Sequence, residues 1–159
     1  MGEIIIKIIN GVGPGPSEEV IGFTEDNLGV SFPENFLSCI KICEEGRPEK
    51  HIFSFKNKLG NQEKSCLGAF LGFDPQNKYN ILRKYLLYFC PFQPHLVPFA
   101  EVGNGDYICF DYSVSGFDDK NPPVVYFDHE QPNGENISDI AINFEEFLNK
   151  LEPEEETDF

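Results

Sequence analysis

The order of apolar and polar positions predicts helices near both ends of the chain and a sheet between them. Apolar residues recur at helical spacing in four segments, at 17–28, 33–45, 79–89 and 143–151. Three runs of β-branched and aromatic residues predict central strands at 96–100, 107–112 and 124–128. Asn104-Gly105 is a hairpin turn signal between the first two strands. The pattern therefore predicts an α+β fold with a central antiparallel or mixed β-sheet and flanking helices near both termini.

Capping residues indicate where three of these helices begin. Ser17 is a favourable N-cap, and the acids that follow it suit the positive end of a helix dipole. Ser31 and Glu34 have the spacing of a capping box, with a proline between them at an early helical position. Asn143 and Glu146 have the same spacing near the C-terminus. We expect helices to start close to these residues.

Length and composition suit a single folded domain. We expect residues 1–151 to form this domain and residues 152–159 to be a disordered acidic tail. Shorter strands are predicted at 3–9, 51–55 and 66–73. Sixteen Phe and a hydrophobic fraction of 40% indicate a bulky aromatic core.

Negative charge is concentrated toward the C-terminus. The net charge is −15, and residues 101–159 contain sixteen acids against two lysines. Such a field repels nucleic acid, because phosphates require cationic partners. The same field attracts a basic protein and speeds its encounter. The charge therefore argues against direct nucleic-acid binding and favours a basic protein partner.

The segment between residues 96 and 130 carries a surplus of carboxylates, which are our candidate partner-binding residues. They are Glu101, Asp106, Asp111, Asp118, Asp119, Asp128 and Glu130. Tyr107, Tyr112 or Tyr126 would add an apolar anchor if exposed, because a few aromatic residues often dominate interface energies. Alternation along 107–112 leaves both strand faces partly apolar, so the pattern does not decide which acids face outward.

Patterns for metals and cofactors are incomplete in this sequence. Cys39 and Cys43 lie four residues apart, but the second close pair of ligands that a zinc site needs is missing. Asp128, His129 and Glu130 could ligate a cation, yet the glycine that follows is one position too far along for an EF-hand loop. We expect no metal and no cofactor.

Catalytic motifs are incomplete as well. The glycine-rich segment 11–16 lacks the lysine of a phosphate-binding loop, and its prolines remove backbone amides. Ser113 and Ser115 lie outside the G-x-S-x-G turn of a hydrolase. Cys109 lies in an apolar run of the most electronegative region, which disfavours a reactive thiolate. Paired carboxylates for glycoside hydrolysis stay open, because any of the sixteen C-terminal acids could contribute.

Cysteine usage and the lack of targeting signals indicate a cytoplasmic protein. The five cysteines are an odd number and lie in apolar runs, at Cys39, Cys43, Cys66, Cys90 and Cys109. No secretory signal precedes them, and no stretch approaches the length of a membrane span. We therefore expect reduced, buried thiols in a cytosol.

Two groups of motifs resemble the SUKH superfamily, which is named after the yeast Smi/Knr cell-wall-assembly regulators. The N-terminal group is Leu28-Gly29, Phe32-Pro33 and Phe36-Leu37. The C-terminal group comprises Pro98-Phe99-Ala100, Gly105-Asp106, Asp111, Pro123-Val124-Val125, Asp128-His129-Glu130, Ala141, Phe144 and Phe147-Leu148. Together they span residues 17–151, nearly the whole chain.

This resemblance implies a mixed α/β fold without known enzymatic activity. Bacterial members act as cytoplasmic immunity proteins that bind and neutralise a cognate toxin, commonly a nuclease domain, and fungal relatives regulate cell-wall synthesis through partner binding. We therefore expect a non-enzymatic immunity protein that binds a basic toxin domain through its acidic surface. The alternatives are a regulatory scaffold of the fungal type and, third, a hydrolase that uses paired carboxylates.

Overall fold

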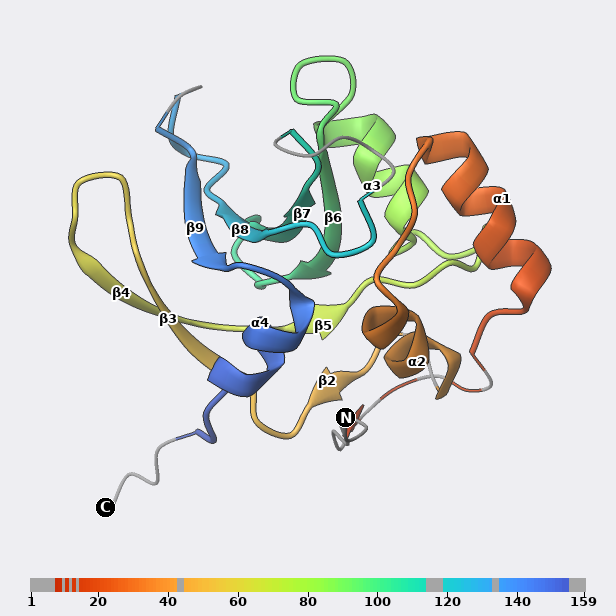
Figure 1. Ribbon diagram of the computed structural model, residues 1–159, viewed down its shortest axis with the longest axis horizontal. Helices are drawn as coiled ribbons and strands as arrows, with labels where there is room; N and C mark the ends of the chain where they lie inside the picture. The colour runs from red at the N-terminus through yellow and green to blue at the C-terminus, as the bar shows by residue number, and fades with distance from the viewer. Residues whose placement is uncertain are drawn as a thin grey trace.

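A five-stranded antiparallel sheet forms the centre of the fold (Figure 1). The computed structural model describes residues 8–9, 11, 13, 15–42, 45–113, 119–132 and 135–154. The strands follow one another in chain order across the sheet, as β5 Ala69–Phe70, β6 Leu96–Glu101, β7 Tyr107–Asp111, β8 Val124–Phe127 and β9 Ile137–Ala141. Each strand therefore pairs with its neighbour in sequence, and the sheet is a simple meander.

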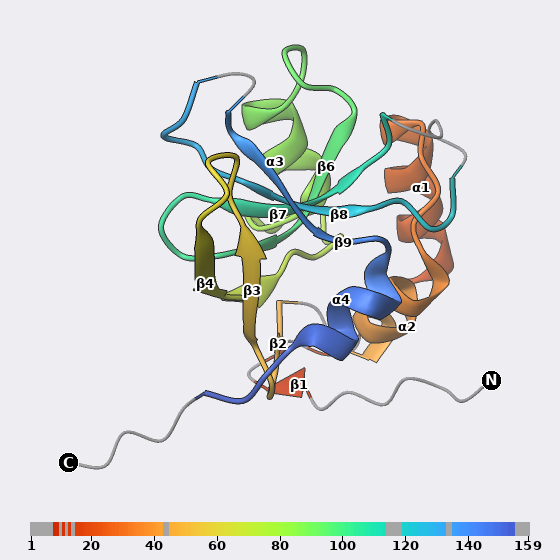
Figure 2. The ribbon, with the colours of Figure 1, turned by 60° about the vertical axis from the view of Figure 1, so that its left-hand side comes forward.

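Four helices and two small two-stranded sheets surround this meander within the described residues. The helices are α1 Glu18–Leu28, α2 Glu34–Ile42, α3 Ile81–Tyr88 and α4 Phe144–Lys150. The additional strand pairs are β1 Ile8–Ile9 with β2 Arg47–Pro48, and β3 Ile52–Lys56 with β4 Gln62–Cys66. The hairpin of β3 and β4 lies beside β9 (Figure 2). This arrangement confirms the predicted α+β class, with helices near both ends of the chain.

Both faces of the central strands are covered by aromatic side chains. Phe36 from α2 and Phe144 from α4 pack on Phe110 of β7, with ring centroids 5.4 and 6.0 Å apart. On the opposite face, Phe89 follows α3 and packs 4.7 Å from Phe127 of β8. Strands that are buried on both faces need apolar residues at successive positions. This explains why β6, β7 and β8 appear in the sequence as apolar runs without alternation.

The predicted helices are confirmed, with one difference in capping. The Ser17 hydroxyl accepts the Val20 N–H at 3.3 Å, and the Asn143 side chain accepts the Glu146 N–H at 2.9 Å. By contrast, α2 begins only at Glu34, after the proline, so Ser31 does not open it. A residue that precedes proline is disfavoured in the helical region, which moves the start of α2 past Pro33.

The three central strands are confirmed, while strands β4 and β9 were not predicted. The β4 sequence is almost entirely polar, and in β9 the exposed Asp139 interrupts the apolar residues. The strand expected at 3–9 is described only at its last two residues. Glu152, the first residue of the expected tail, pairs through its backbone with Ile52 of β3, and residues 155–159 lie outside the described part.

The cysteines partly follow the expectation of buried thiols. Cys39 and Cys109 are buried, Cys66 is half-buried and Cys90 is exposed. Cys43 lies outside the described residues. In the part of the chain that the structure describes, no helix is long and apolar enough to cross a membrane.

Candidate functional site

A polar cleft of about 290 Å³ opens where the β6–β7 turn and the end of β8 meet strand β4. Its lining combines carboxylates, one imidazole, one ammonium group and neutral polar groups around two aromatic rings. The lining residues are Phe55, Glu63, Lys64, Ser65, Asn104, Asp106, Tyr126, Asp128, His129 and Glu130. Half of these come from the β6–β7 turn and from the segment that follows β8, where the motifs of the sequence analysis converge.

Asp106 lies at the centre of a hydrogen-bond network in this cleft. Its side chain is buried, with 5% of the residue surface exposed. One carboxylate oxygen accepts the Tyr126 hydroxyl at 2.5 Å, and the other accepts the His129 backbone N–H at 3.0 Å. The imidazole Nδ1 of His129 lies 2.6 Å from the same oxygen, so it donates to the ionised carboxylate. Asp106 therefore ties the start of β7 to β8 and to the segment beyond it.

The network shifts the pKa values of its members in opposite directions. Burial opposes ionisation of Asp106, but hydrogen bonds from Tyr126 and His129 outweigh it and lower the pKa of the carboxyl group. The hydrogen bond to Asp106 raises the pKa of His129, against partial desolvation, and neighbouring carboxylate charges add to this rise. Burial, followed by the hydrogen bond to Asp106, raises the pKa of Tyr126. Both the lowered pKa of Asp106 and the raised pKa of His129 favour the ion pair of a carboxylate with an imidazolium.

Gly105 allows the imidazole to reach Asp106. Its φ of +97° lies in the region that residues with a side chain avoid. A Cβ at this position would also lie 2.8 Å from Cε1 of His129, inside normal contact distance. The ring can therefore lie over the turn only if position 105 is glycine, which gives a physical reason for the pair Gly105-Asp106.

We expect the contribution of His129 to stability to depend on pH. A raised pKa in the folded state stabilises the fold fully below the usual value of 6.5, and this contribution is lost as the pH rises through the raised value. A lowered pKa of Asp106 stabilises the fold above 3.8 and is lost as the pH falls through the lowered value. The free energy of unfolding of the wild type should therefore exceed that of His129→Gln most between pH 3.8 and 6.5.

Urea unfolding at a series of pH values and constant ionic strength measures this difference. In the background of Asp106→Asn, the same His129→Gln change should give a difference that varies little with pH, because the partner charge is gone. If the free energy of unfolding of the wild type exceeded that of His129→Gln by a growing amount above pH 7, this would contradict the pairing of His129 with Asp106.

The cleft also contains a group with the spacing of cation ligands. Ligand atoms of Asp106, Asp128 and His129 all lie within 4.8 Å of one another. Both oxygens of Asp106 already accept hydrogen bonds, and Nδ1 of His129 is engaged with one of them. A cation bound by all three would have to displace this imidazole from its carboxylate. The geometry therefore favours a structural role for the three residues over a metal site.

The chemical capacity of the cleft is to hold an oriented imidazole next to carboxylates. Nε2 of His129 lies on the side away from Asp106, 3.9 Å from a carboxylate oxygen of Glu130. Ser65 hydrogen-bonds to Tyr126 and thereby lowers the pKa of that hydroxyl slightly against the other effects. The serine of this cleft therefore faces the tyrosine, whereas a Ser-His-Asp arrangement would need it on the imidazole.

The structure brings together three of the seven candidate acids. Asp106 forms the floor of the cleft, while the half-buried Asp128 and the exposed Glu130 lie at its rim. The Asp128 carboxylate accepts the N–H of Glu130 at 3.0 Å, which shapes this rim. Because Asp106 is buried and its oxygens are engaged internally, it cannot serve as an exposed contact and acts by positioning its neighbours.

The remaining candidates lie elsewhere. Glu101 pairs with Tyr107 on the α3 side of the sheet. Burial raises the pKa of Glu101, and the positive charge of Lys84 partly offsets this rise. Asp111 is at the far end of β7, about 17 Å from Asp106 along the strand at a rise of about 3.4 Å per residue. Asp119 lies near that end, because its charge acts on the Tyr112 hydroxyl. Asp118 lies outside the described residues.

The carboxylates therefore form separate groups and not one continuous surface. Strand register explains the separation, because residues at the two ends of β7 face different loops.

The three tyrosines proposed as anchors are also buried, with 8%, 1% and 7% of Tyr107, Tyr112 and Tyr126 exposed. The Tyr112 hydroxyl donates to the Ser31 carbonyl at 2.8 Å, which joins the N-terminal segment to the sheet.

Some residues of the cleft had no signal that identified them as part of a site. Glu63, Lys64 and Ser65 belong to β4, which has the composition of a loop. Asn104 was recognised only as a turn residue, although its side chain also accepts the Asp106 N–H at 3.0 Å. Pairing of β3 with β4 brings the polar strand against the end of the central sheet.

The sequence of this chain matches the model of a known protein family. The model of the SMI1 / KNR4 family (SUKH-1) matches residues 15–150, and the chain belongs to that family. The matched range contains all four helices, the central sheet and the entire polar cleft. No curated protein matches the chain closely enough to provide a more specific relative.

Proposed function

We propose that this protein is a non-enzymatic immunity protein that neutralises a basic toxin domain by binding it at the rim of the polar cleft. The observation that supports this most is the set of carboxylates around the cleft mouth. Glu63 and Glu130 are exposed there, Asp128 is half-buried, and the ionised Asp106 lies beneath them. Membership of the SUKH-1 family is consistent with a role in partner binding. We place this role in the cytoplasm.

Electrostatics explain why such a rim suits a toxin that cleaves nucleic acid. A nuclease holds phosphates with cationic side chains, so its active cleft offers a complementary surface to a group of carboxylates. The overall charge of −15 adds long-range attraction, which increases the rate of encounter and weakens with salt. Lys64 on the same rim interrupts the negative charge and would contribute to the choice of partner.

Charge reversal at the rim tests this proposal. The double variant Glu63→Lys/Glu130→Lys should weaken binding of the basic toxin domain encoded beside the gene by roughly 100-fold, because each substitution replaces attraction with repulsion. The control Glu34→Lys/Glu145→Lys makes the same change in net charge at exposed positions of α2 and α4. Titration calorimetry at two salt concentrations measures binding, and a nuclease assay measures protection.

Each result of this experiment has a definite meaning. Equal weakening by both double variants would remove the cleft as the interface and leave only a general effect of charge. If excess protein leaves the toxin domains encoded near the gene fully active, the immunity function fails.

A regulatory scaffold of the fungal type is the second candidate, because the family description itself includes SMI1 and KNR4. Absence of a toxin gene from the neighbourhood would favour that candidate.

A further inference from the structure

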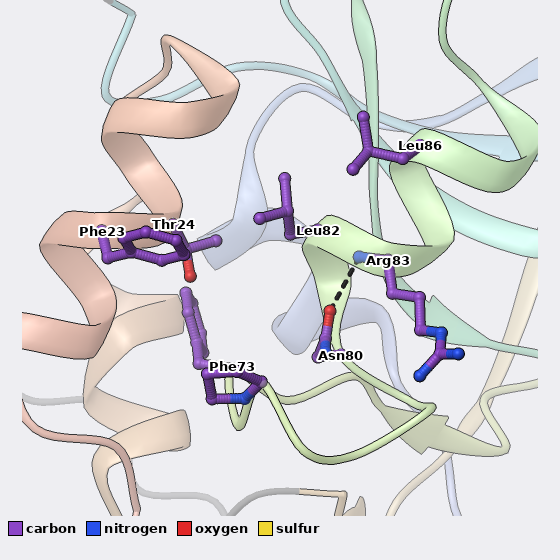
Figure 3. Close-up of a pocket in the computed structure, with 8 residues that line it drawn as sticks. Phe23, Thr24, Phe73, Asn80, Leu82, Arg83 and Leu86 are labelled. Carbon is purple, nitrogen blue, oxygen red and sulfur yellow. Dashed lines mark hydrogen bonds between the residues drawn. The ribbon is translucent and has the colours of Figure 1, made fainter.

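A second, apolar cleft lies between helices α1 and α3 and shares no lining residue with the polar cleft. The two helices run side by side (Figure 1), and the cleft between them has a volume of about 240 Å³. Figure 3 shows Phe23 of α1 and Phe73 on one side of it, and Leu82 and Leu86 of α3 on the other. Large apolar side chains that stay exposed in a group are typical of protein interfaces.

The side chains around this cleft are strongly exposed for apolar residues. Phe23 is 54% exposed and Leu86 is 57% exposed. Their neighbours Thr24 and Phe73 are buried, so the exposed groups stand on a packed base. A partner that covers such side chains would remove their apolar surface from water, which stabilises a complex.

The two helices carry opposite charges beside their apolar side chains. Helix α1 contains four acids and no basic residue, whereas α3 contains Arg83 and Lys84 and no acid. Glu19 and Asp26 lie four residues before and three after Phe23, so they share its side of α1. Arg83 lies three residues before Leu86 on α3 and lines the cleft.

This pairing of charges selects one kind of occupant. A face with one sign of charge would fit a foreign partner of the opposite sign, but this face has an acidic half and a basic half. Consider a two-fold axis that lies in the plane of this face, between the two helices. It places α1 of each copy against α3 of the other copy, so the same contact occurs twice. Acidic residues then meet Arg83 across both contacts, and each Phe23 packs against the leucines of the other copy.

We propose that the α1–α3 face is the interface of a symmetric homodimer. This inference is independent of the toxin-binding proposal, because that rim is built from β4, the β6–β7 turn and the segment after β8. The face measures roughly 16 Å by 20 Å from the helix rise and the usual spacing of packed helices. Such an area, roughly 320 Å² on each copy, is smaller than the roughly 800 Å² per partner of a standard stable interface, so the dimer should be weak and dissociate at roughly 0.1 millimolar or above.

Two charge variants test the dimer through its symmetry. Arg83→Glu makes α3 acidic like α1, and Glu19→Lys/Asp26→Lys makes α1 basic like α3. Each variant alone should dimerise roughly tenfold or more weakly, because like charges then face each other in both contacts. An equal mixture of the two should recover association, because both contacts of the mixed dimer are again between opposite charges.

Sedimentation equilibrium of the full chain from low micromolar to near-millimolar concentration measures the wild type and each variant. Fluorescence transfer between differently labelled variants detects the mixed dimer, and thermal melts confirm that all proteins are folded. A monomeric wild type at every concentration would overturn the proposal, even if the face were then found to bind the toxin domain. Self-association that the variants leave unchanged, or that mixing fails to restore, would also overturn it.

Discussion

Replacing Phe36 by alanine is expected to lower the free energy of unfolding by about 3–5 kcal/mol, the largest effect of a single substitution that we predict. The ring is fully buried at the point where α2 meets the sheet. It contacts aromatic rings from several elements, namely Phe32, Phe70, Phe73, Phe99, Phe110 and Phe144. Removal leaves a cavity bounded by rigid rings, which cannot collapse to fill it.

Denaturant unfolding of Phe36→Ala and of a matched control measures this loss. Phe92→Ala removes the same atoms from a residue that is 82% exposed, so it should change stability by less than about 0.5 kcal/mol. If the two substitutions have similar effects, Phe36 does not anchor α2 to the sheet as its ring contacts indicate.

Asp106→Ala is expected to lower the free energy of unfolding by about 2–4 kcal/mol near pH 6, the second largest effect. The substitution leaves the buried hydroxyl of Tyr126 without its acceptor, and the N–H of His129 loses its partner as well. Buried groups that lose a hydrogen bond cost about 1–3 kcal/mol each, and more when the missing partner was charged. The exposed imidazole of His129 would also lose its counter-charge, which adds little.

Asp128→Ala is the matched control for this substitution. It removes a carboxylate two residues after Tyr126, but one that is half-buried and accepts a local N–H from Glu130. Its loss should cost about 1 kcal/mol or less. Thermal and urea unfolding at pH 6 compare the two variants, and a small effect of Asp106→Ala would show that water replaces the carboxylate in the network.

The fold was predictable where local signals and tertiary packing agree. Ser17 and Asn143 cap helices that also have apolar faces, so propensity and burial indicate the same element. Strand β4 was missed because its polar sequence forms a strand only through pairing with β3. The start of α2 was placed too early because a capping-box spacing was given more weight than the restriction imposed by Pro33.

The site was predictable in composition but not in arrangement. The sequence showed that carboxylates gather between residues 96 and 130, yet it could not show that Asp106 is buried. Alternation assigns Asp106 and Ile108 to one side of β7, and only the packing of Tyr126 and β4 over that side decides its burial. Glu63 joins the rim from a strand more than forty residues earlier, so no local pattern connects it with Asp106.

The order of the elements along the chain has a consequence for synthesis on the ribosome. Helix α2 emerges before the sheet it covers, since Phe36 precedes its partner Phe99 by 63 positions and Phe144 by 108. At roughly 5–20 residues per second, its apolar face waits about 3 to 20 seconds for those rings to be made. The nascent chain therefore exposes aromatic surface that the completed protein hides, and it is during this interval that chaperone contact matters most.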